Sequence, residues 1–263
     1  MYTKITRLIT LPLFLLLLSS FTALLVQKRK PVLYIIGDST VRNGDGTGKN
    51  QQWGWGSMIA PYFDTTRISI RNHAIGGRSS RTFITEGRWE EIRKTLQPGD
   101  YVIMQFGHND AGALDDTARA RGSIRGTGEE TKDIYNPVRK MPETVHTYGW
   151  YMRNYANDAK AKGAVAIICS PVPRNNFKDG KVERADSSYG KWAAETAVTT
   201  RAFFIPLNTI IAEQYEALGP DQVNAFFPGD HTHTNEAGAI LNAKSVVKGL
   251  QDLRRCHLRR YLR

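Results

Sequence analysis

The stretch VLYIIGDST at residues 32–40 joins a continuous apolar run to a short polar turn. Near-continuous apolar runs of this length are typical of strands that are covered on both faces of a parallel sheet. Ser39 would then follow the strand directly, where the turn toward a helix exposes a hydroxyl among backbone N–H groups that can stabilise an oxyanion. Serines and threonines after strands are more often turn or cap residues, so this stretch alone does not establish catalysis.

Four further short runs, rich in β-branched and aromatic residues, predict strands at residues 68–72, 101–106, 164–169 and 203–206. Segments with helical spacing lie between and after them, at residues 54–63, 87–96, 144–162, 189–200, 209–218 and 235–253. This alternation predicts an α/β fold, a doubly wound three-layer α/β/α sandwich whose central, mainly parallel sheet has about five strands.

Two long, largely polar insertions follow the third and fourth predicted strands, at residues 111–136 and 171–188. In open α/β sheets, ligands bind beyond the carboxyl ends of the strands. Long loops in that position usually carry the residues that contact the substrate. The sequence therefore predicts that both insertions help to build the substrate site.

The first thirty residues differ in composition from the rest of the chain. Lys4 and Arg7 precede an apolar run over residues 8–26, and a basic stretch at residues 28–30 follows it. A charge-free run of about 19 residues with basic flanks is typical of an export segment rather than of a buried helix. We therefore expect residues 1–30 to be a signal peptide or an uncleaved membrane anchor, and the protein to be secreted or periplasmic. No clear small-x-small cleavage site distinguishes the two.

The rest of the chain has the composition of one globular catalytic domain, which we place at residues 31–253. The net charge is +11, but residues 31–250 hold 26 basic and 24 acidic side chains, because the excess lies at the two ends. This balance excludes a nucleic-acid-binding domain. Residues 254–263 hold five arginines. We predict a solvated basic tail there, with contact to a membrane surface or a polyanion as the alternative.

The two cysteines, Cys169 and Cys256, have no CxxC spacing and cannot form a metal cluster alone. An exported protein could pair them in a disulfide. Cys169 lies at the end of a predicted strand and Cys256 lies in the basic tail, so we expect two free thiols.

A second polar cluster, Asp230-His231-Thr232-His233, precedes the last predicted helix. A carboxylate and an imidazole three residues apart can form the base half of a catalytic triad, and the chain order Ser, Asp, His is one that such triads use. Spacing alone leaves His231 and His233 as alternatives for the base. The same side chains could bind a metal or cap the helix, but three ligands within four residues would make a strained metal site.

Four blocks together resemble the SGNH (GDSL) hydrolase superfamily, in the same order along the chain: GDSTV at 37–41, NHAIGGRS at 72–79, GHND at 107–110 and DHTHT at 230–234. The similarity spans residues 32 to about 250. It implies a carboxylic ester hydrolase with an SGNH, flavodoxin-like fold, in which Ser39 is the nucleophile, His233 the general base and Asp230 the residue that orients it. The implied oxyanion donors are the backbone N–H groups of Ser39 and Gly77 and the side-chain amide of Asn109. No cofactor and no metal are implied.

Within the superfamily, four stretches are similar to rhamnogalacturonan acetylesterases: GDST at 37–40, GGRSSRTF at 76–83, EGRW at 86–89 and FPGDHTHT at 227–234. The similarity implies a serine esterase that removes O-acetyl groups from the pectin backbone, with an acetylated polysaccharide or oligosaccharide as its partner. We expect the protein to be a monomer. The alternatives are an SGNH esterase for another acetylated carbohydrate such as xylan, a lipid esterase, and a non-catalytic carbohydrate-binding protein. The polar insertions disfavour a lipid, and the complete triad disfavours a non-catalytic role.

Candidate substrate contacts flank the second block and the Ser39 turn. Arg78, Arg81 and Arg88 could pair with galacturonate carboxylates, because guanidinium groups bind planar anions well, although surface ion pairs are the alternative. Trp53 or Trp55 could stack on a sugar ring, since both follow the Ser39 turn closely in the sequence, whereas the other aromatic residues have the spacing of core positions.

Overall fold

The computed structural model describes residues 29–263, and Pro31–Arg263 form one compact unit. The expected export segment, with its apolar run over residues 8–26, lies outside the described residues except for Arg29 and Lys30. Among the helices of residues 29–263, none is both long and apolar enough to cross a membrane.

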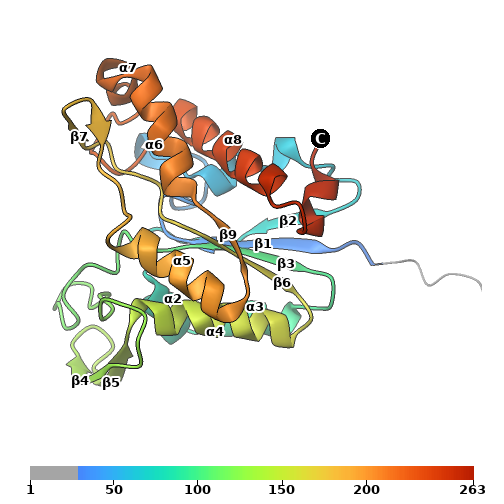
Figure 1. Ribbon diagram of the computed structural model, residues 1–263. Coiled ribbons are helices and arrows are strands. Elements are labelled where there is room, and N and C mark those ends of the chain that lie inside the picture. The colour runs from blue at the N-terminus through green and yellow to red at the C-terminus, as the bar shows by residue number, and fades with distance from the viewer. Residues whose placement is uncertain (1–28) are drawn as a thin grey trace, which may run out of the picture. The chain divides into compact units, whose positions relative to one another are not determined.

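A sheet of five parallel strands lies at the centre of this unit, in the order β2-β1-β3-β6-β9 (Figure 1). The strands are β1 (Val32–Gly37), β2 (Ser69–Asn72), β3 (Tyr101–Gln105), β6 (Val165–Cys169) and β9 (Phe203–Ile205). The chain goes from β1 outward to β2 and then crosses to β3 on the other side of β1. Such a switch point opens a crevice at the carboxyl ends of the strands, where ligands bind. The predicted fold class is confirmed.

Helices cover both faces of the sheet and complete the three layers (Figure 1). One face carries α2 (Ser80–Thr85), α3 (Arg88–Thr95), α4 (Tyr148–Ala161) and α5 (Tyr189–Thr200). The other carries α6 (Leu207–Leu218) and α8 (Glu236–Asp252), with the short α7 (Pro220–Asn224) after α6. Alternate side chains of β1 serve the two layers, since Tyr34 and Ile36 pack in the first core and Leu33 and Ile35 in the second.

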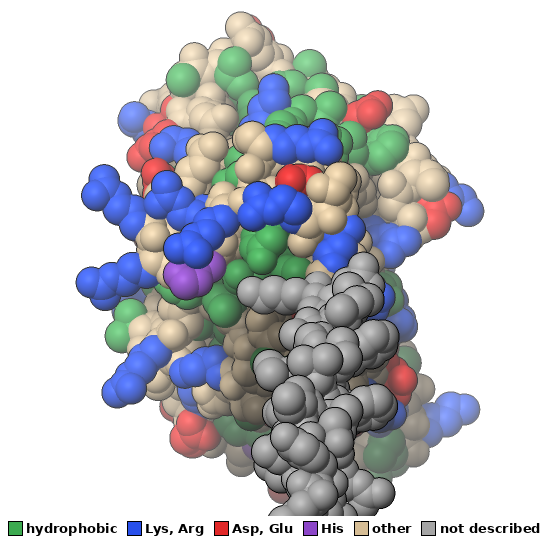
Figure 2. All heavy atoms as spheres, turned by 90° about the vertical axis from the view of Figure 1, so that its right-hand side faces the viewer, with side chains coloured by type: hydrophobic (Ala, Val, Ile, Leu, Met, Phe, Trp, Pro, Cys, Tyr) green, Lys and Arg blue, Asp and Glu red, His purple; other side chains and the backbone are tan. Residues whose placement is uncertain are grey.

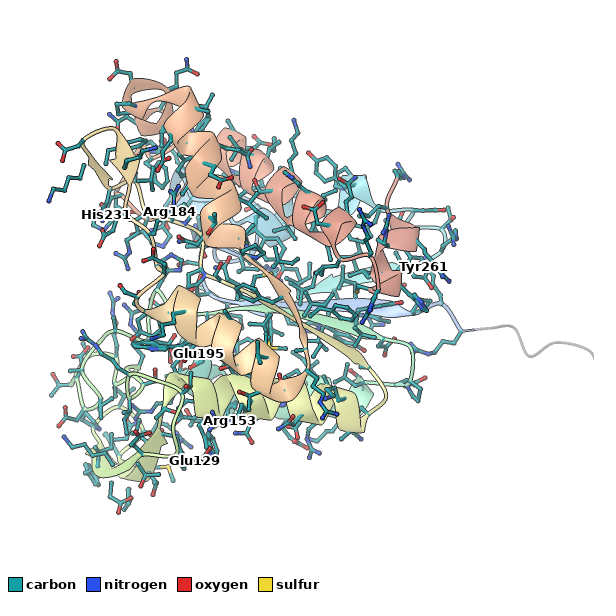
Figure 3. The ribbon with its side chains drawn as sticks, in the orientation of Figure 1. Glu129, Arg153, Arg184, Glu195, His231 and Tyr261 are labelled. Carbon is teal, nitrogen blue, oxygen red and sulfur yellow. The ribbon has the colours of Figure 1, made fainter. Side chains whose placement is uncertain are left out.

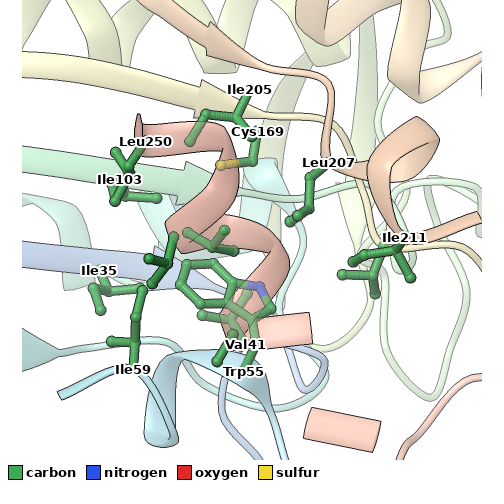
Figure 4. Packing of buried hydrophobic residues seen from close by; sticks show 14 of the residues in the cluster. Ile35, Val41, Trp55, Ile59, Ile103, Cys169, Ile205, Leu207, Ile211 and Leu250 are labelled. Carbon is green, nitrogen blue, oxygen red and sulfur yellow. The ribbon is translucent and has the colours of Figure 1, made fainter. Parts of the chain in front are cut away.

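Trp55 is the largest side chain of the second core and is fully buried (Figure 4). It belongs to the same cluster as Ile35 and Ile103 from the sheet and Leu250 from α8. Full burial of an indole of this size contributes strongly to the stability of the fold. Trp55 is therefore a core residue, and the suggestion that it stacks on a sugar is wrong.

The helix predicted over residues 54–63 is also wrong. The structure has two short 3-10 turns there, η2 (Trp55–Ser57) and η3 (Ala60–Tyr62). Gly54 lies so close to the Ser39 turn that a Cβ on it would be 2.2 Å from the Val41 carbonyl carbon. The Gly54 backbone is extended, with φ −111° and ψ 146°, so no helix begins at this residue.

Both insertions lie at the carboxyl ends of the strands (Figure 1). The sequence did not reveal two hairpins there, one that begins in the first insertion and extends past it to His146, and one within the second. β4 (Thr131–Asn136) pairs with β5 (Met141–His146), and β7 (Phe177–Lys178) pairs with β8 (Lys181–Val182). The helix predicted from residue 144 consequently starts later, at Tyr148. Thr147 caps it, because the Thr147 side chain accepts a hydrogen bond from the Trp150 backbone N–H.

The last ten residues are packed against the domain rather than free. The 3-10 turn η4 (His257–Tyr261) buries Leu258 completely, and Leu262 forms a β-bridge with Phe63. The five arginines and His257 are the exposed residues of this segment, so the predicted solvated tail is wrong for its backbone. Both cysteines are free thiols and are buried in the second core, Cys169 on β6 and Cys256 just before η4.

Candidate active site

Four segments at the carboxyl ends of the sheet meet around Ser39. They are the turn after β1, the segment after β2, the turn after β3 and the loop before α8, which hold the four blocks that the sequence singled out. The approach is close, since a Cβ on Gly76 would lie 3.5 Å from the Ser39 Cβ. The fold therefore gathers blocks that are far apart in the chain.

Ser39, His233 and Asp230 form a continuous hydrogen-bonded chain. The Ser39 Oγ lies 2.7 Å from His233 Nε2, and His233 Nδ1 lies 2.7 Å from Asp230 Oδ2. Asp230 Oδ1 accepts hydrogen bonds from the backbone N–H groups of Thr232 and His233. Burial alone would raise the pKa of Asp230, but the hydrogen bonds outweigh it and lower the pKa to about 2. The carboxylate is therefore ionised at ordinary pH and holds the imidazole with Nε2 toward the serine.

The two histidines of the 230–234 loop have different partners, which decides between the alternatives that spacing left open. His231 Nε2 lies 3.0 Å from the Arg174 guanidinium, whereas His233 Nε2 faces Ser39. A shared metal would require both imidazoles to converge with Asp230 on one point. Each imidazole instead has its own hydrogen-bond partner, so only His233 is placed to act on the serine.

The turn that presents Ser39 is organised by the buried carboxylate of Asp38. Asp38 Oδ1 accepts hydrogen bonds from the Thr40 backbone N–H and hydroxyl, at 2.9 and 2.7 Å. Asp38 Oδ2 lies 3.3 Å from His108 Nδ1, which links the turn to the third block. Burial alone would raise the pKa of Asp38, but His108 and Thr40 outweigh it and lower the pKa. Asp38 thus has a structural role beside the triad that the sequence did not suggest.

A second chain of hydrogen bonds ties this turn to the core. Gln105 Nε2 donates to the Thr40 hydroxyl at 2.7 Å, and Trp55 Nε1 donates to Gln105 Oε1 at 2.8 Å. All three side chains are buried. A fully satisfied buried network of this kind fixes the position of the groups it joins. Ser39 is therefore held on a rigid support, as a nucleophile requires.

The three oxyanion donors implied by the resemblance have N–H bonds available beside Ser39. The backbone N–H groups of Ser39 and Gly77 donate no hydrogen bond to any residue between 29 and 263. Gly77 has a φ of 80°, a left-handed conformation that favours glycine. Asn109 is nearly buried, and its amide donates one hydrogen to the Arg78 carbonyl at 2.9 Å, which leaves the second hydrogen for a ligand. Their role in catalysis remains a prediction.

Asp110, in the third block, links that block to the start of α2 through its side chain. Its carboxyl group is fully buried and accepts hydrogen bonds from the Ser80 and Ser123 hydroxyls. Burial raises the pKa of Asp110 to about 6, although these hydrogen bonds act in the opposite direction. Because Ser80 begins α2, this contact positions the helix that follows Gly77.

Arg81 was predicted to contact substrate, and the structure contradicts this. Its side chain is fully buried, and its Nε lies 2.7 Å from Glu143 Oε1 on β5. Its Nη1 donates to the carbonyl groups of Leu114 and Gly122 in the first insertion. Arg81 therefore fastens the insertion to α2 and cannot reach a ligand.

The other predicted contacts remain accessible in part. Arg78 and Arg88 both pair with Glu86, at 3.0 and 2.6 Å, so the two arginines share one carboxylate at the surface. Trp53 is half-buried. It lies beside the triad loop, since its backbone N–H donates to the Thr234 carbonyl at 2.8 Å. A shallow hollow runs along Trp53 to the start of α8. Of these residues, Trp53 has the best position for a sugar contact.

A pocket of about 390 Å³ lies beside the triad, between the loops that follow β3 and β6. His231 and Arg184 line it, as Figure 3 shows at the end of the sheet where the strands terminate. Arg184 is neutralised by Glu216 at 2.9 Å. Arg174, in contrast, forms no ion pair with a carboxylate among residues 29–263, and its guanidinium lines the same pocket. An unpaired guanidinium next to the triad is suited to a substrate carboxylate.

Arg121 is a second cation at the site that the sequence did not single out. It comes from the first insertion, and its Nη1 donates to the Gly77 carbonyl at 3.2 Å. Arg174 comes from the second insertion. The prediction that the insertions contribute to the site is thus supported by their arginines, although the individual residues could not be chosen from sequence.

Comparison with known proteins agrees with this geometry. The chain matches the GDSL-like Lipase/Acylhydrolase family over residues 35–240. It is 36% identical to the rhamnogalacturonan acetylesterase of Emericella nidulans, over 87% of this chain and 88% of that protein. It is 30% identical to the probable rhamnogalacturonan acetylesterase YesY of Bacillus subtilis, over 84% of this chain and 93% of that protein.

Two solved structures share the fold. The crystal structure of YxiM from Bacillus subtilis is similar at a TM-score of 0.68 and 27% identity, and the match covers 85% of this chain and 57% of that one. The present chain therefore spans little more than half the length of YxiM. An acetylxylan esterase from Geobacillus stearothermophilus, Axe2, is similar at a TM-score of 0.56 and 18% identity, over 84% of this chain and 94% of that one. This second likeness concerns the fold alone.

Proposed function

Because the chain belongs to the GDSL-like lipase/acylhydrolase family, we propose that it is a serine esterase that removes O-acetyl groups from rhamnogalacturonan. The observation that carries the proposal is the hydrogen-bonded chain from Ser39 through His233 to Asp230. The similarity to rhamnogalacturonan acetylesterases along most of the chain supports the substrate.

The triad geometry supports a two-step mechanism. Ser39 Oγ attacks the acetyl carbonyl carbon while His233 Nε2 takes the hydroxyl proton, and the Asp230 carboxylate stabilises the imidazolium that forms. The tetrahedral intermediate collapses when the sugar oxygen leaves with the proton from His233, and the acetyl group stays on Ser39. Water then attacks this acyl-enzyme with His233 again as base, and acetate is released. His233 gives the proton taken from this water to Ser39 Oγ as the acyl bond breaks, which regenerates the serine hydroxyl and the neutral imidazole.

The negative oxygen of each tetrahedral intermediate needs donors that are already in place. The backbone N–H groups of Ser39 and Gly77 and the free hydrogen of the Asn109 amide would supply three. Because these groups are fixed by the turn network and by the Arg78 carbonyl, they need no rearrangement as charge develops.

Two cations support an acidic polysaccharide as substrate. Arg174 lines the pocket beside the triad, and Arg121 lies over the Gly77 carbonyl. Guanidinium groups bind carboxylates through charge-assisted hydrogen bonds, which galacturonate can provide and neutral xylan or a lipid tail cannot. Trp53 could add an aromatic face for a neighbouring sugar. In this proposal Arg121 and Arg174 bind the galacturonate carboxylates that Arg81 was predicted to bind.

We propose further that the protein is exported and acts as a monomer. The basic flanks and the apolar run over residues 8–26 support a signal peptide or membrane anchor. All the groups of the proposed mechanism come from one chain, which supports a monomer. The mass of the mature protein recovered from the culture medium and the membrane fraction would distinguish cleavage from anchoring.

A substrate panel tests the proposed function. Acetate release is measured from acetylated rhamnogalacturonan, xylan and chitin oligosaccharides for the wild type and for Ser39→Ala. Ser69→Ala, on β2 at the opposite end of the sheet, is the matched control. We expect a preference for rhamnogalacturonan that Ser69→Ala keeps and Ser39→Ala loses. A preference for xylan would overturn the assignment of rhamnogalacturonan as substrate. Activity that survives Ser39→Ala would overturn the serine mechanism.

A further inference from the structure

The end of the domain opposite the active site carries a dense group of cations (Figure 2). We call it the basic end face, and it consists of the exposed residues Arg67, Arg254, Arg255, Arg259, Arg260 and Arg263. Two acidic side chains lie close to it: Asp64 near Arg67 and Arg263, and Asp252, which pairs with Lys248. The face therefore keeps a clear positive excess, while the rest of the domain is almost balanced.

The scaffold beneath these arginines is ordered by contacts with the core. The Tyr261 ring meets the Tyr101 ring at the start of β3, with centroids 6.1 Å apart, and the Arg67 guanidinium lies 5.2 Å from the centre of the Tyr261 ring. The backbone N–H of Asp64 donates to the Tyr261 carbonyl at 2.7 Å, and Leu258 is fully buried. The arginines are consequently displayed on a fixed surface.

The basic end face and the triad lie at opposite ends of α8. Asn235, two residues after His233, caps this helix, and Arg254 follows its other end. Seventeen helical residues at about 1.5 Å each separate the two ends by roughly 25 Å. The right-hand position of Tyr261 and the left-hand position of His231 in Figure 3 show the same separation.

The chain enters the domain on this same face. Pro31 precedes β1, and Ser69 at the start of β2 donates its backbone N–H to the Pro31 carbonyl at 2.9 Å. Only residues 27–30 separate Pro31 from the apolar run over residues 8–26. Since an extended chain covers at most about 3.5 Å per residue, a bilayer holding that run would lie within about 18 Å of Pro31.

We propose that the basic end face binds the anionic headgroups of a lipid bilayer and holds the active site facing away from the membrane. Basic segments next to an apolar membrane segment are attracted to anionic headgroups, and this chain has a basic patch and an apolar segment at one end. The proposal is independent of the substrate assigned above.

The chain entry favours lipid over an acidic polysaccharide as the partner of this face. A polyanion would require only the charge, whereas an apolar run a few residues from the same face has no use in polysaccharide binding. The acidic substrate has its own cations, Arg121 and Arg174, at the other end of the domain.

The test is the binding of the full chain to vesicles of phosphatidylcholine with and without phosphatidylglycerol. The variant carries Arg→Gln substitutions at positions 254, 255, 259, 260 and 263. The matched control removes five exposed cations from the hairpins at the active-site end, by the substitutions Lys132→Gln, Arg139→Gln, Lys140→Gln, Lys178→Gln and Lys181→Gln. Each cation near an anionic surface strengthens binding about fivefold, so the loss of five predicts binding weaker by about 3 × 10³-fold if all five contact the surface, and by about tenfold or more if only some do.

We expect the arginine variant to lose binding to phosphatidylglycerol vesicles while the control keeps it, with binding to pure phosphatidylcholine equal in all three proteins. Hydrolysis of p-nitrophenyl acetate verifies that the variant is folded, and a fivefold Arg→Lys variant should retain binding. Equal losses in variant and control, or no loss in either, would overturn the proposal. The proposal would also be overturned if the arginine variant kept vesicle binding and lost binding to polygalacturonate.

A salt titration of the wild type checks the same proposal without any substitution. Phosphatidylglycerol-dependent binding should fall steeply between about 50 mM and about 500 mM salt, because screening weakens exposed charges. Binding that is independent of salt would contradict the proposal.

Discussion

His233 Nε2 lies 2.7 Å from Ser39 Oγ, although 194 residues separate the two in the chain. The contact depends on two elements: the turn that Asp38 fixes after β1 and the loop that Asn235 ends by capping α8. In the proposed mechanism every proton transfer involves His233 Nε2. The predictions that follow test the groups around it.

Asp230→Asn should lower kcat about 10⁴-fold, because an amide cannot stabilise the imidazolium and favours the wrong tautomer. Asp230 has its pKa lowered to about 2, so its carboxylate is fully formed above its ordinary value of 3.8 and is lost only as the pH falls through about 2. The wild type should hence keep the contribution of this carboxylate throughout the range from about pH 4 to about pH 9, and the variant should have the lower kcat at every pH in it. Asp221→Asn on α7 is the control, and a variant that reaches the wild-type kcat within this range would contradict the assignment.

Asn109→Ala should lower kcat by about 10² to 10³ with little change in KM, because an oxyanion donor acts in the transition state. Steady-state kinetics on p-nitrophenyl acetate measure both constants. Asn154→Ala removes an amide that donates to the Trp150 carbonyl far from the site, and it should leave both constants unchanged. A rise in KM with normal kcat would show that Asn109 binds substrate without stabilising the oxyanion.

Arg81→Met should destabilise the fold by about 3–5 kcal/mol, since Glu143 would be left buried without its partner. Arg93→Met, which breaks the exposed pair with Glu90, should cost less than about 1 kcal/mol. Urea unfolding measures both. Burial alone would raise the pKa of Glu143, but Arg81 and its other partners outweigh it and lower the pKa, so the contribution of the pair should fade as the pH drops below 4.5. Equal stability of the two variants would contradict a structural role for Arg81.

Arg174→Gln should raise KM for acetylated rhamnogalacturonan about 10-fold to 100-fold, as expected for the loss of a hydrogen bond to a charged group. The kinetics on p-nitrophenyl acetate, which has no carboxylate, should not change. Lys178→Gln removes a nearby exposed cation of the same insertion as a control. An equal effect on both substrates would mean that Arg174 supports the triad loop through His231 and does not bind the polysaccharide.

The sheet and the four site segments could be predicted from sequence because parallel strands covered on both faces appear as continuous apolar runs. Polar residues directly after such runs, as in Gly37-Asp38-Ser39, must then gather at one edge. The hairpin of β4 and β5 could not be predicted, since its strands are largely exposed and lack a hydrophobic period. Helix α2 has only six residues, too few for a helical pattern.

The individual arginines were the least predictable part of the site. Arg78, Arg81 and Arg88 are close in sequence, but their environments depend on partners from other segments. Arg81 is buried because Glu143 meets it from a hairpin 62 residues away. Arg174 becomes a candidate only because the second insertion brings it to His231. Side-chain burial and ion pairing of this kind are set by tertiary contacts, which local spacing does not encode.

The central claim is that Ser39 is the activated nucleophile, and covalent labelling tests it most directly. A p-nitrophenyl phosphonate ester reacts with an activated serine to give a stable tetrahedral adduct, which peptide mass spectrometry locates. We predict one adduct, on Ser39, with esterase activity lost in proportion to labelling and with no adduct in His233→Ala. An adduct on another residue, or full activity in protein labelled at Ser39, would contradict the claim.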